Sequence, residues 1–241
     1  MQRYYFFSNL QVIFQENWLY LCAMKYKLVI FDLDGTLVDT IVDLGAAANA
    51  ALAAKGLPQH EPGAFRGMVG HGVRNLMKQA MPEAMRADEQ ALDALLDVFL
   101  KYYIEHIDER SRPYPGIREL LQELQAAGVE LAVASNKFQV GAEKLVGRMF
   151  PEIPFAAVLG GRPGVPLKPD PSIVAEIRSR AGVSLRETVM VGDSATDIAT
   201  AAGAEVDCVA VSWGFRTREQ LGAAPRIVDT AQELRTLLFA E

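Results

Sequence analysis

The stretch at residues 27–40 reads KLVIFDLDGTLVDT and places two carboxylates directly behind an apolar run. The apolar residues 28–31 suit a buried strand, whereas Asp32 and Asp34 interrupt the pattern two positions apart. Two carboxylates this close repel each other unless another charge offsets them. The stretch therefore predicts a core strand that ends at a polar site.

Beyond residue 24 the chain alternates between strand-like and helix-like patterns. The strand-like runs are short, rich in valine and apolar on both faces, as in buried parallel strands; they are residues 27–32, 129–135, 155–160, 188–193 and 207–212. Helical patterns lie at residues 116–128, 140–149, 171–182, 196–204 and 230–239, and several of them end in glycine. This alternation predicts an α/β fold with a doubly wound parallel-sheet (Rossmann-like) core.

One region breaks the alternation, because residues 40–110 contain helical patterns without a convincing strand. The segment returns through SRPYPGI, a linker rich in proline and glycine. We expect an inserted all-helical cap domain at residues 40–111, with residues 24–39 and 112–241 forming the α/β core domain. Residues 1–23 are aromatic and apolar but interrupted by polar residues, and we interpret them as an N-terminal extension of uncertain status.

Four polar residues follow predicted strands and should meet at one edge of the sheet. Asp32, Ser135 and Asp193 end three strands, and Lys168 lies in the loop after a fourth. Ligands of open α/β sheets bind beyond the carboxyl ends of the strands. Oxygen ligands of this kind suit Mg²⁺, which Asp32, Asp193 and one backbone carbonyl would hold together with water and a phosphate oxygen.

The same residues predict phosphoryl chemistry. A carboxylate at Asp32 can attack phosphorus and form an aspartyl-phosphate, while Asp34 protonates the leaving oxygen and later activates water. Lys168 and Ser135 would neutralise charge on the transferring phosphoryl group. Plainer readings remain open: a solvated loop lysine for Lys168 and a helix N-cap for Ser135 or Asp193.

The motifs DLDGT, ASN, KPDP and GDSATDI resemble, in this order, those of the haloacid dehalogenase (HAD) superfamily of phosphatases. The resemblance spans nearly all of residues 25–241 and implies a Mg²⁺-dependent nucleophile at Asp32, an acid/base at Asp34 and a metal contact through the Asp34 carbonyl. It also implies acidic metal-site residues at Asp193 and Asp197. Asp197 would bind metal through water or hold Lys168, or merely favour the N-terminus of its helix.

Further candidates for substrate or phosphate binding lie near these motifs. Gly35 and Thr36 are expected to form a tight turn with amides near the phosphate, and Asn136 to bind phosphate or serve in a plain turn. In the cap, His71 and Arg74 stand at a predicted helix start that suits anions, with Arg74 as a partner for a substrate carboxylate. Surface charge for Arg74 and a structural role for His71 are the alternatives.

Composition excludes some partners. The net charge of -6 argues against a nucleic-acid partner, and no unbroken apolar segment predicts a membrane span. Two cysteines, Cys22 and Cys208, exclude a disulfide framework and fit a reducing cytoplasm. The expected partner is a small phosphorylated metabolite, bound by a monomer or homodimer.

Within the superfamily, DLDGTLVDT, VGHGVRNLM and VSWGF look most like phosphoglycolate phosphatases. The resemblance thus implies a phosphoric monoester hydrolase acting on 2-phosphoglycolate. The alternatives are a phosphosugar mutase of the beta-phosphoglucomutase type, a phosphatase of another small phosphate ester or pyrophosphate, and a non-catalytic scaffold. Phosphonate hydrolysis and dehalogenation fit less well, because those relatives lack an acid/base aspartate at the position of Asp34.

Overall fold

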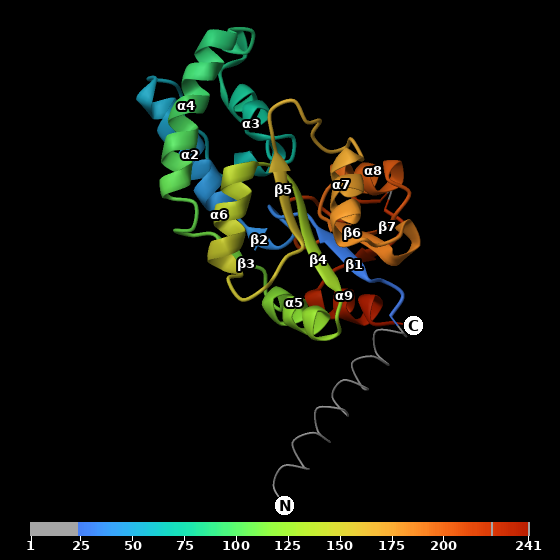
Figure 1. Ribbon diagram of the computed structural model, residues 1–241. Coiled ribbons are helices and arrows are strands. Elements are labelled where there is room, and N and C mark those ends of the chain that lie inside the picture. Colours follow the sequence, from blue (N-terminus) through green and yellow to red (C-terminus); the bar gives the residue numbers. More distant parts are fainter. Residues whose placement is uncertain (1–23, 223, 241) are drawn as a thin grey trace, which may run out of the picture.

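A parallel six-stranded sheet forms the centre of the protein (Figure 1). The computed structural model describes residues 24–222 and 224–240, so the expectation for residues 1–23 lies outside it. The sheet order is β5-β4-β1-β6-β7-β8. The strands are β1 (Leu28–Phe31), β4 (Glu130–Phe138), β5 (Ala157–Gly161), β6 (Thr188–Gly192), β7 (Asp207–Val211) and β8 (Ile227–Val228). The sequence pattern missed β8 because two residues are too few to show a strand period.

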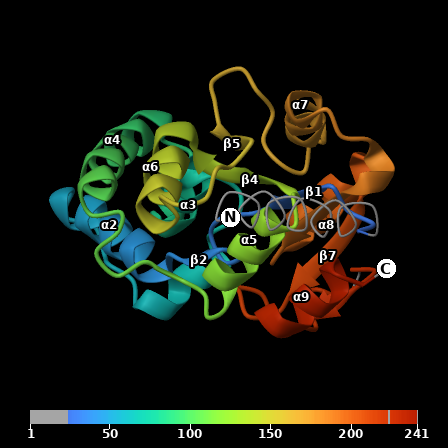
Figure 2. The ribbon, with the colours of Figure 1, turned by 60° about the horizontal axis from the view of Figure 1, so that its bottom comes forward.

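Alternate residues of strand β1 pack into two separate hydrophobic clusters, one on each face of the sheet. Val29 and Phe31 of β1 pack in one cluster with helices α5 (Ile117–Ala126), α6 (Gln139–Met149) and α9 (Ala231–Leu238). Leu28 and Ile30 pack in another cluster with α7 (Ser172–Ala181) and α8 (Ala195–Gly203). Figure 2 shows α5 and α7 on opposite sides of the sheet. Both faces of the sheet are thus covered by helices, which confirms the doubly wound α/β fold.

A helical insertion follows the first strand. It contains α2 (Ile41–Ala54), α3 (Val73–Ala80) and α4 (Glu89–Glu105), with short 3₁₀ helices at Pro62–Gly67 and Glu83–Met85. Figure 1 shows α2, α3 and α4 grouped to one side, away from α7 and α8. This insertion, called the cap below, has the helical character expected from the sequence. Its domain boundaries at residues 40 and 111 stay a prediction.

The chain enters and leaves the cap through a small antiparallel ribbon. Strand β2 (Val38–Asp39) pairs with β3 (Arg112–Pro113). Next to it, the buried Asp43 carboxylate accepts hydrogen bonds from the backbone N–H groups of Arg110 and Ser111. The linker expected from its prolines and glycine therefore contains a paired segment. A proline is tolerated there because a two-residue edge ribbon does not need its missing N–H.

No helix within residues 24–222 and 224–240 has the length and apolar character that crossing a membrane requires.

Candidate active site

Three buried carboxylates converge at the end of the sheet. Asp32 follows β1, Asp193 follows β6, and Asp197 lies in the first turn of α8. Each offers an oxygen within 4.8 Å of the other two. Their exposed fractions are only 8%, 3% and 1%. Parallel strands end at the same edge, so residues far apart in the sequence share one site.

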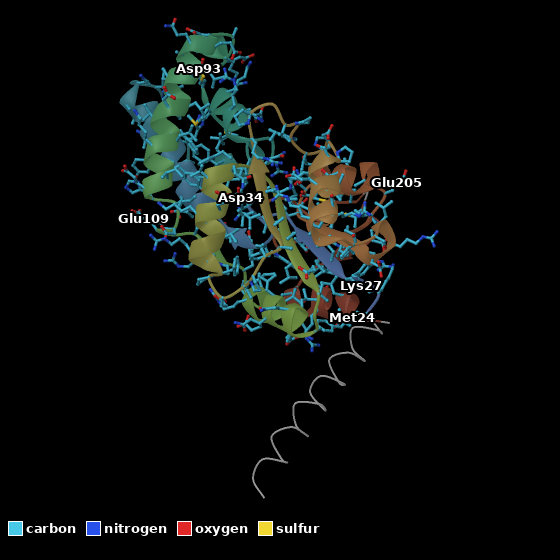
Figure 3. All side chains as sticks on the ribbon, in the orientation of Figure 1. Met24, Lys27, Asp34, Asp93, Glu109 and Glu205 are labelled. Atoms are coloured by element: carbon cyan, nitrogen blue, oxygen red, sulfur yellow. The ribbon has the colours of Figure 1, made fainter. Side chains whose placement is uncertain are left out.

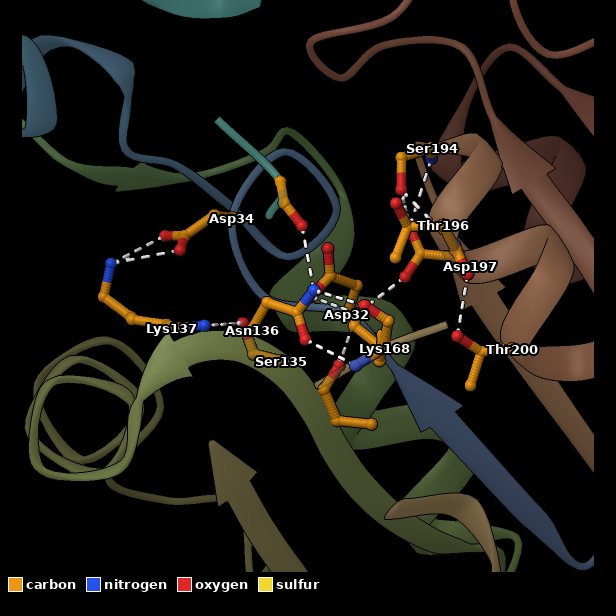
Figure 4. Close-up of polar contacts among 12 residues, drawn as sticks. Asp32, Asp34, Ser135, Asn136, Lys137, Lys168, Ser194, Thr196, Asp197 and Thr200 are labelled. Atoms are coloured by element: carbon orange, nitrogen blue, oxygen red, sulfur yellow. Dashed lines mark hydrogen bonds and ion pairs between the residues drawn. The ribbon is translucent and has the colours of Figure 1, made fainter. Parts of the chain in front are cut away.

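One ammonium group bridges two of these carboxylates (Figure 4). Lys168 Nζ lies 2.6 Å from Asp197 Oδ1 and 2.9 Å from Asp32 Oδ1, and it also donates to the Ala134 carbonyl at 2.8 Å. Burial alone would lower the pKa of Lys168, but the negative charges of Asp197 and Asp32 outweigh burial and raise it. Lys168 is therefore a permanently charged part of the site.

The carboxylates carry more negative charge than Lys168 can offset. Burial raises the pKa of Asp32 to about 7. The positive charge of Lys168 lowers this pKa, and the negative charge of Asp197 raises it further. Burial, reinforced by Asp32 and Asp197, also raises the pKa of Asp193 well above its usual value. A divalent cation would offset this repulsion, so the donor set fits a hard metal such as Mg²⁺.

Asp193 and Asp197 differ in how many of their carboxylate oxygens already accept hydrogen bonds from the protein. Asp197 Oδ1 accepts from Lys168, and its Oδ2 accepts from the N–H and the hydroxyl of Ser194 in a capping box. Within the part of the chain that the structure describes, Asp193 accepts a hydrogen bond through Oδ2 only, from the Phe215 N–H at 2.7 Å. Asp193 thus keeps Oδ1 for a ligand, whereas both oxygens of Asp197 already have protein donors.

Gly35 permits the close packing of this site. Its φ of +92° is in the left-handed region, and a Cβ there would lie 2.3 Å from Asp193 Oδ2. Any side chain at this position would therefore displace the Asp193 carboxylate. The turn uses the N–H groups of Gly35 and Thr36 internally, with the carbonyls of Val38 and Leu33 as acceptors. This geometry runs against the expectation that both amides face a phosphate.

Ser135 and Asn136, at the end of β4, differ in whether their side chains still have a hydrogen-bonding group for a ligand. Ser135 Oγ is buried and accepts from the Lys137 N–H at 3.2 Å, so its own proton remains to be donated. The side-chain amide of Asn136 donates to the backbone carbonyls of Lys168 and of Gly70 in the cap. Its oxygen accepts from the Lys168 N–H. Asn136 thus positions the Lys168 loop, and its amide is already occupied by protein partners.

Lys137 is a site residue that sequence reasoning missed. Its ammonium contacts the Asp34 carboxylate at 2.9 and 3.1 Å and donates to the Tyr103 hydroxyl of α4 at 2.6 Å. Figure 4 shows Asp34 turned toward Lys137 and away from Asp32 and Lys168. The sequence showed only a lysine two positions after Ser135, and the strand is irregular between Ala134 and Phe138, so the direction of the Lys137 side chain could not be inferred from strand period.

The pocket above the carboxylates is closed partly by the cap. Its lining includes Asp32, Ser135 and Lys168 from the core, with apolar walls from α2, α3 and α4. Arg216, in the loop after β7, also lines it. The sequence offered only the motif VSWGF in front of this arginine, and that motif says nothing about its direction.

The structure brings neither His71 nor Arg74 into this pocket. His71 is exposed. Arg74 pairs with Glu89 and Asp93, both at 2.5 Å, and these hydrogen bonds raise its pKa. Figure 3 places Asp93 at the far end of the cap, well away from Asp34. The sequence-based expectation of a substrate contact is corrected here, because Arg74 projects toward α4 rather than toward the sheet.

Thr36 is fully buried in the turn after β1 but is not among the pocket-lining residues. Its carbonyl accepts from Trp213 Nε1 at 3.1 Å. Thr36 therefore contributes to the turn rather than to the walls of the pocket.

Comparison with known proteins agrees with this arrangement. Residues 29–211 match the family described as haloacid dehalogenase-like hydrolase. The chain is 36% identical over 219 residues to a phosphoglycolate phosphatase of Mesorhizobium japonicum, covering 90% of this chain and 96% of that protein. It is also 36% identical to a phosphoglycolate phosphatase of Agrobacterium fabrum, covering 88% of this chain and 92% of the relative.

A solved structure gives the same picture. A crystal structure from Lactobacillus delbrueckii subsp. bulgaricus, provisionally assigned as a phosphoglycolate phosphatase, superposes with a TM-score of 0.84 at 35% identity. The match covers 90% of this chain and all of that one. The similarity therefore includes both the sheet and the cap.

Proposed function

The chain belongs to the haloacid dehalogenase-like hydrolase family, and on that premise we propose that it is a Mg²⁺-dependent phosphatase of small anionic phosphomonoesters, with 2-phosphoglycolate as substrate. The observation that carries the proposal is the buried Asp32 carboxylate, held 2.9 Å from Lys168 between two further carboxylates. Such a group is restrained, poorly solvated and open toward the pocket, as a nucleophile should be.

In the first step Asp32 attacks phosphorus. A bond forms between its carboxylate oxygen and phosphorus while the bond from phosphorus to the ester oxygen breaks. The ester oxygen leaves as an alkoxide and takes the proton of the Asp34 carboxyl group. To act as this acid, Asp34 has to leave the Lys137 ammonium, on which its carboxylate lies in the free protein, and take up a proton from solvent before it reaches the ester oxygen.

In the second step Asp34 acts as a base. It takes a proton from water, whose oxygen forms the new bond to phosphorus as the bond to Asp32 breaks. Inorganic phosphate leaves, Asp32 is again a carboxylate, and Asp34 again carries the proton, which it releases to solvent when it returns to Lys137. The adjacent Lys137 ammonium stabilises the ionised Asp34 that this step requires.

Two groups would bind the phosphoryl oxygens. The Ser135 hydroxyl has a free proton, and the Lys168 ammonium lies beside Asp32. A positive charge and a donor placed next to the nucleophile stabilise the charge of the transferring group more than that of the free ester.

The side chains of Asp32 and Asp193 and the carbonyl of Asp34 would hold the metal. Asp197 would face the ion through water, because both of its oxygens already accept hydrogen bonds from Lys168 and Ser194. A bound Mg²⁺ supplies positive charge that offsets the carboxylate repulsion and neutralises phosphoryl oxygens.

The choice of substrate rests on the relatives, which carry the name phosphoglycolate phosphatase at 36% identity. The test is phosphate release from 2-phosphoglycolate, a hexose phosphate, pyrophosphate and an aryl phosphate, each with Mg²⁺ and with EDTA. We expect Mg²⁺-dependent turnover with the highest kcat/KM on 2-phosphoglycolate, and loss of several orders of magnitude in Asp32→Asn. Substantial turnover by folded Asp32→Asn would refute the covalent mechanism. A preference for the hexose phosphate would refute the substrate assignment alone.

A further inference from the structure

Three basic side chains line the pocket, and two of them are already neutralised. Lys168 pairs with Asp32 and Asp197. Lys137 pairs with Asp34. Arg216 differs, because no carboxylate of the described residues lies within ion-pairing distance of it. Its positive charge acts on Asp193 only at longer range, and its hydrogen bonds within the described chain go to the backbone carbonyls of Arg66 and Val69. Among the described residues, Arg216 is thus the pocket cation without a carboxylate in direct contact, so a ligand carboxylate can take that place.

The Arg216 backbone is anchored at the catalytic edge of the sheet. The N–H of its neighbour Phe215 donates to Asp193 Oδ2 at 2.7 Å. The preceding Gly214 is packed so closely that a Cβ there would lie 2.4 Å from both Asp193 and the Gly35 carbonyl. The loop carrying Arg216 is thus fixed against the site that would hold the phosphoryl group.

The Arg216 side chain also spans core and cap. It donates through one terminal nitrogen to the Arg66 carbonyl at 2.5 Å and through the other to the Val69 carbonyl at 2.6 Å. A guanidinium has five N–H donors, so these bonds leave three for another acceptor. Arg216 can therefore bind an anion in the pocket without releasing the cap.

We propose that Arg216 binds the carboxylate of the substrate and is the residue that makes the enzyme selective for a phosphomonoester with a carboxylate next to the ester group. The inference rests on the proposed phosphatase function and assigns Arg216 to bind the end of the substrate that does not carry the phosphoryl group. Binding at Arg216 adds a charged acceptor to a cation that has only neutral ones. Binding at Lys137 would instead compete with Asp34 and leave a buried charge without its partner, which is costly.

The planar fork of arginine suits this task. Two parallel N–H groups match the two oxygens of a carboxylate, whereas an ester with a neutral end offers no such partner. Removal of a charged hydrogen bond of this kind costs roughly ten- to a hundredfold in binding. The effect should fall on the carboxylated substrate alone.

The experiment compares 2-phosphoglycolate with ethyl phosphate, which has a methyl group in place of the carboxylate, in the presence of Mg²⁺. In Arg216→Ala we expect kcat/KM for 2-phosphoglycolate to fall by roughly ten- to a hundredfold, mainly through KM, and that for ethyl phosphate to change less than about threefold. Arg216→Lys keeps the charge without the fork and should lie between the two.

Arg66→Ala is the matched control. Arg66 donates back to the Gly214 carbonyl at 3.4 Å and is not among the pocket-lining residues, so its loss weakens the same junction of cap and core without touching the substrate. We expect the two substrates to respond equally in this variant. The ratio of kcat/KM for 2-phosphoglycolate to that for ethyl phosphate thus distinguishes loss of carboxylate binding from loss of contact between cap and core.

Equal losses on both esters in folded Arg216→Ala would show that Arg216 only clamps the cap, and no loss on either would place it outside the site; each result overturns the inference while leaving the phosphatase assignment intact. Failure of the wild-type enzyme to hydrolyse 2-phosphoglycolate would instead overturn the substrate assignment, and the inference with it. Circular dichroism and thermal melting of each variant establish that it is folded.

Discussion

Lys137 holds the carboxylate of Asp34 at 2.9 and 3.1 Å, and the same ammonium donates to the hydroxyl of Tyr103. The contact joins the core strand β4, the turn after β1 and the cap helix α4. The side chains of Lys137 and Asp34 are only 3% and 11% exposed, so their charges are poorly screened by solvent. The Lys137 ammonium thus connects Asp34, the proposed acid/base residue, to Tyr103 of the cap.

Lys137→Met should destabilise the protein. Methionine keeps much of the side-chain volume but leaves the buried Asp34 carboxylate without its counter-charge, and breaking a buried pair from one side costs about 3–5 kcal/mol. Urea unfolding would measure the loss in the free energy of unfolding. The double variant Lys137→Met with Asp34→Asn should recover part of it, because no unpaired charge remains. A double variant that is destabilised by the sum of the single effects would contradict a coupled pair.

Asp34→Asn should slow poor leaving groups more than good ones. An alkyl oxygen needs a proton as it departs, whereas an aryl oxygen is stable enough to leave without one. We expect the ratio of kcat/KM for an aryl phosphate to that for an alkyl phosphate to rise by about tenfold or more relative to wild type. An unchanged ratio would argue against proton donation by Asp34.

Metal-free protein should lose stability as the pH rises from about 5 to 7. The pKa of Asp32 is raised to about 7 by burial, and that of Asp193 is also raised, so the folded state binds protons more tightly than the unfolded chain. The free energy of unfolding therefore falls with rising pH across this interval. In EDTA we expect the melting temperature to decline by a few degrees from pH 5 to pH 7.5.

Added Mg²⁺ should reverse this decline, because it binds the ionised carboxylates and therefore stabilises the protein more at pH 7.5 than at pH 5. Exposed aspartates such as Asp207 and Asp229 have lowered pKa values and are largely ionised in both states at pH 5, so they contribute little over this interval. Asp32→Asn should flatten the profile in EDTA. A melting temperature that rises over the same interval in EDTA would contradict the assignment.

Gly35→Ala should weaken the metal site. The added Cβ would lie 2.3 Å from Asp193 Oδ2 at a backbone φ of +92°, so the carboxylate must move. We expect the Mg²⁺ concentration for half-maximal activity to rise by about tenfold or more. Gly56→Ala is the control for an alanine at positive φ, since at its φ of +66° the added Cβ meets nothing within 4 Å. Equal Mg²⁺ requirements in the two variants would show that the collision is relieved without moving Asp193.

The sequence by itself determined the fold class and the strand ends. Short valine-rich apolar runs that alternate with helical patterns predict buried parallel strands, and parallel strands bring their carboxyl ends to one edge whatever their order. That rule alone placed Asp32, Ser135, Lys168 and Asp193 near one another. It needed no knowledge of side-chain direction, because position along the chain and strand polarity were sufficient.

Only the tertiary structure decided which charges face the pocket. Arg74 carried the expected signal, a basic residue at a helix start, yet its helix turns it toward acidic partners on α4. Arg216 and Lys137 carried no such signal. Lys137 meets Asp34 across 103 positions of sequence, and Arg216 meets the Val69 carbonyl across 147. Local pattern fixes the face on which a residue lies, but its partner depends on how the cap is seated on the sheet, and that arrangement results from packing contacts between segments far apart in the chain.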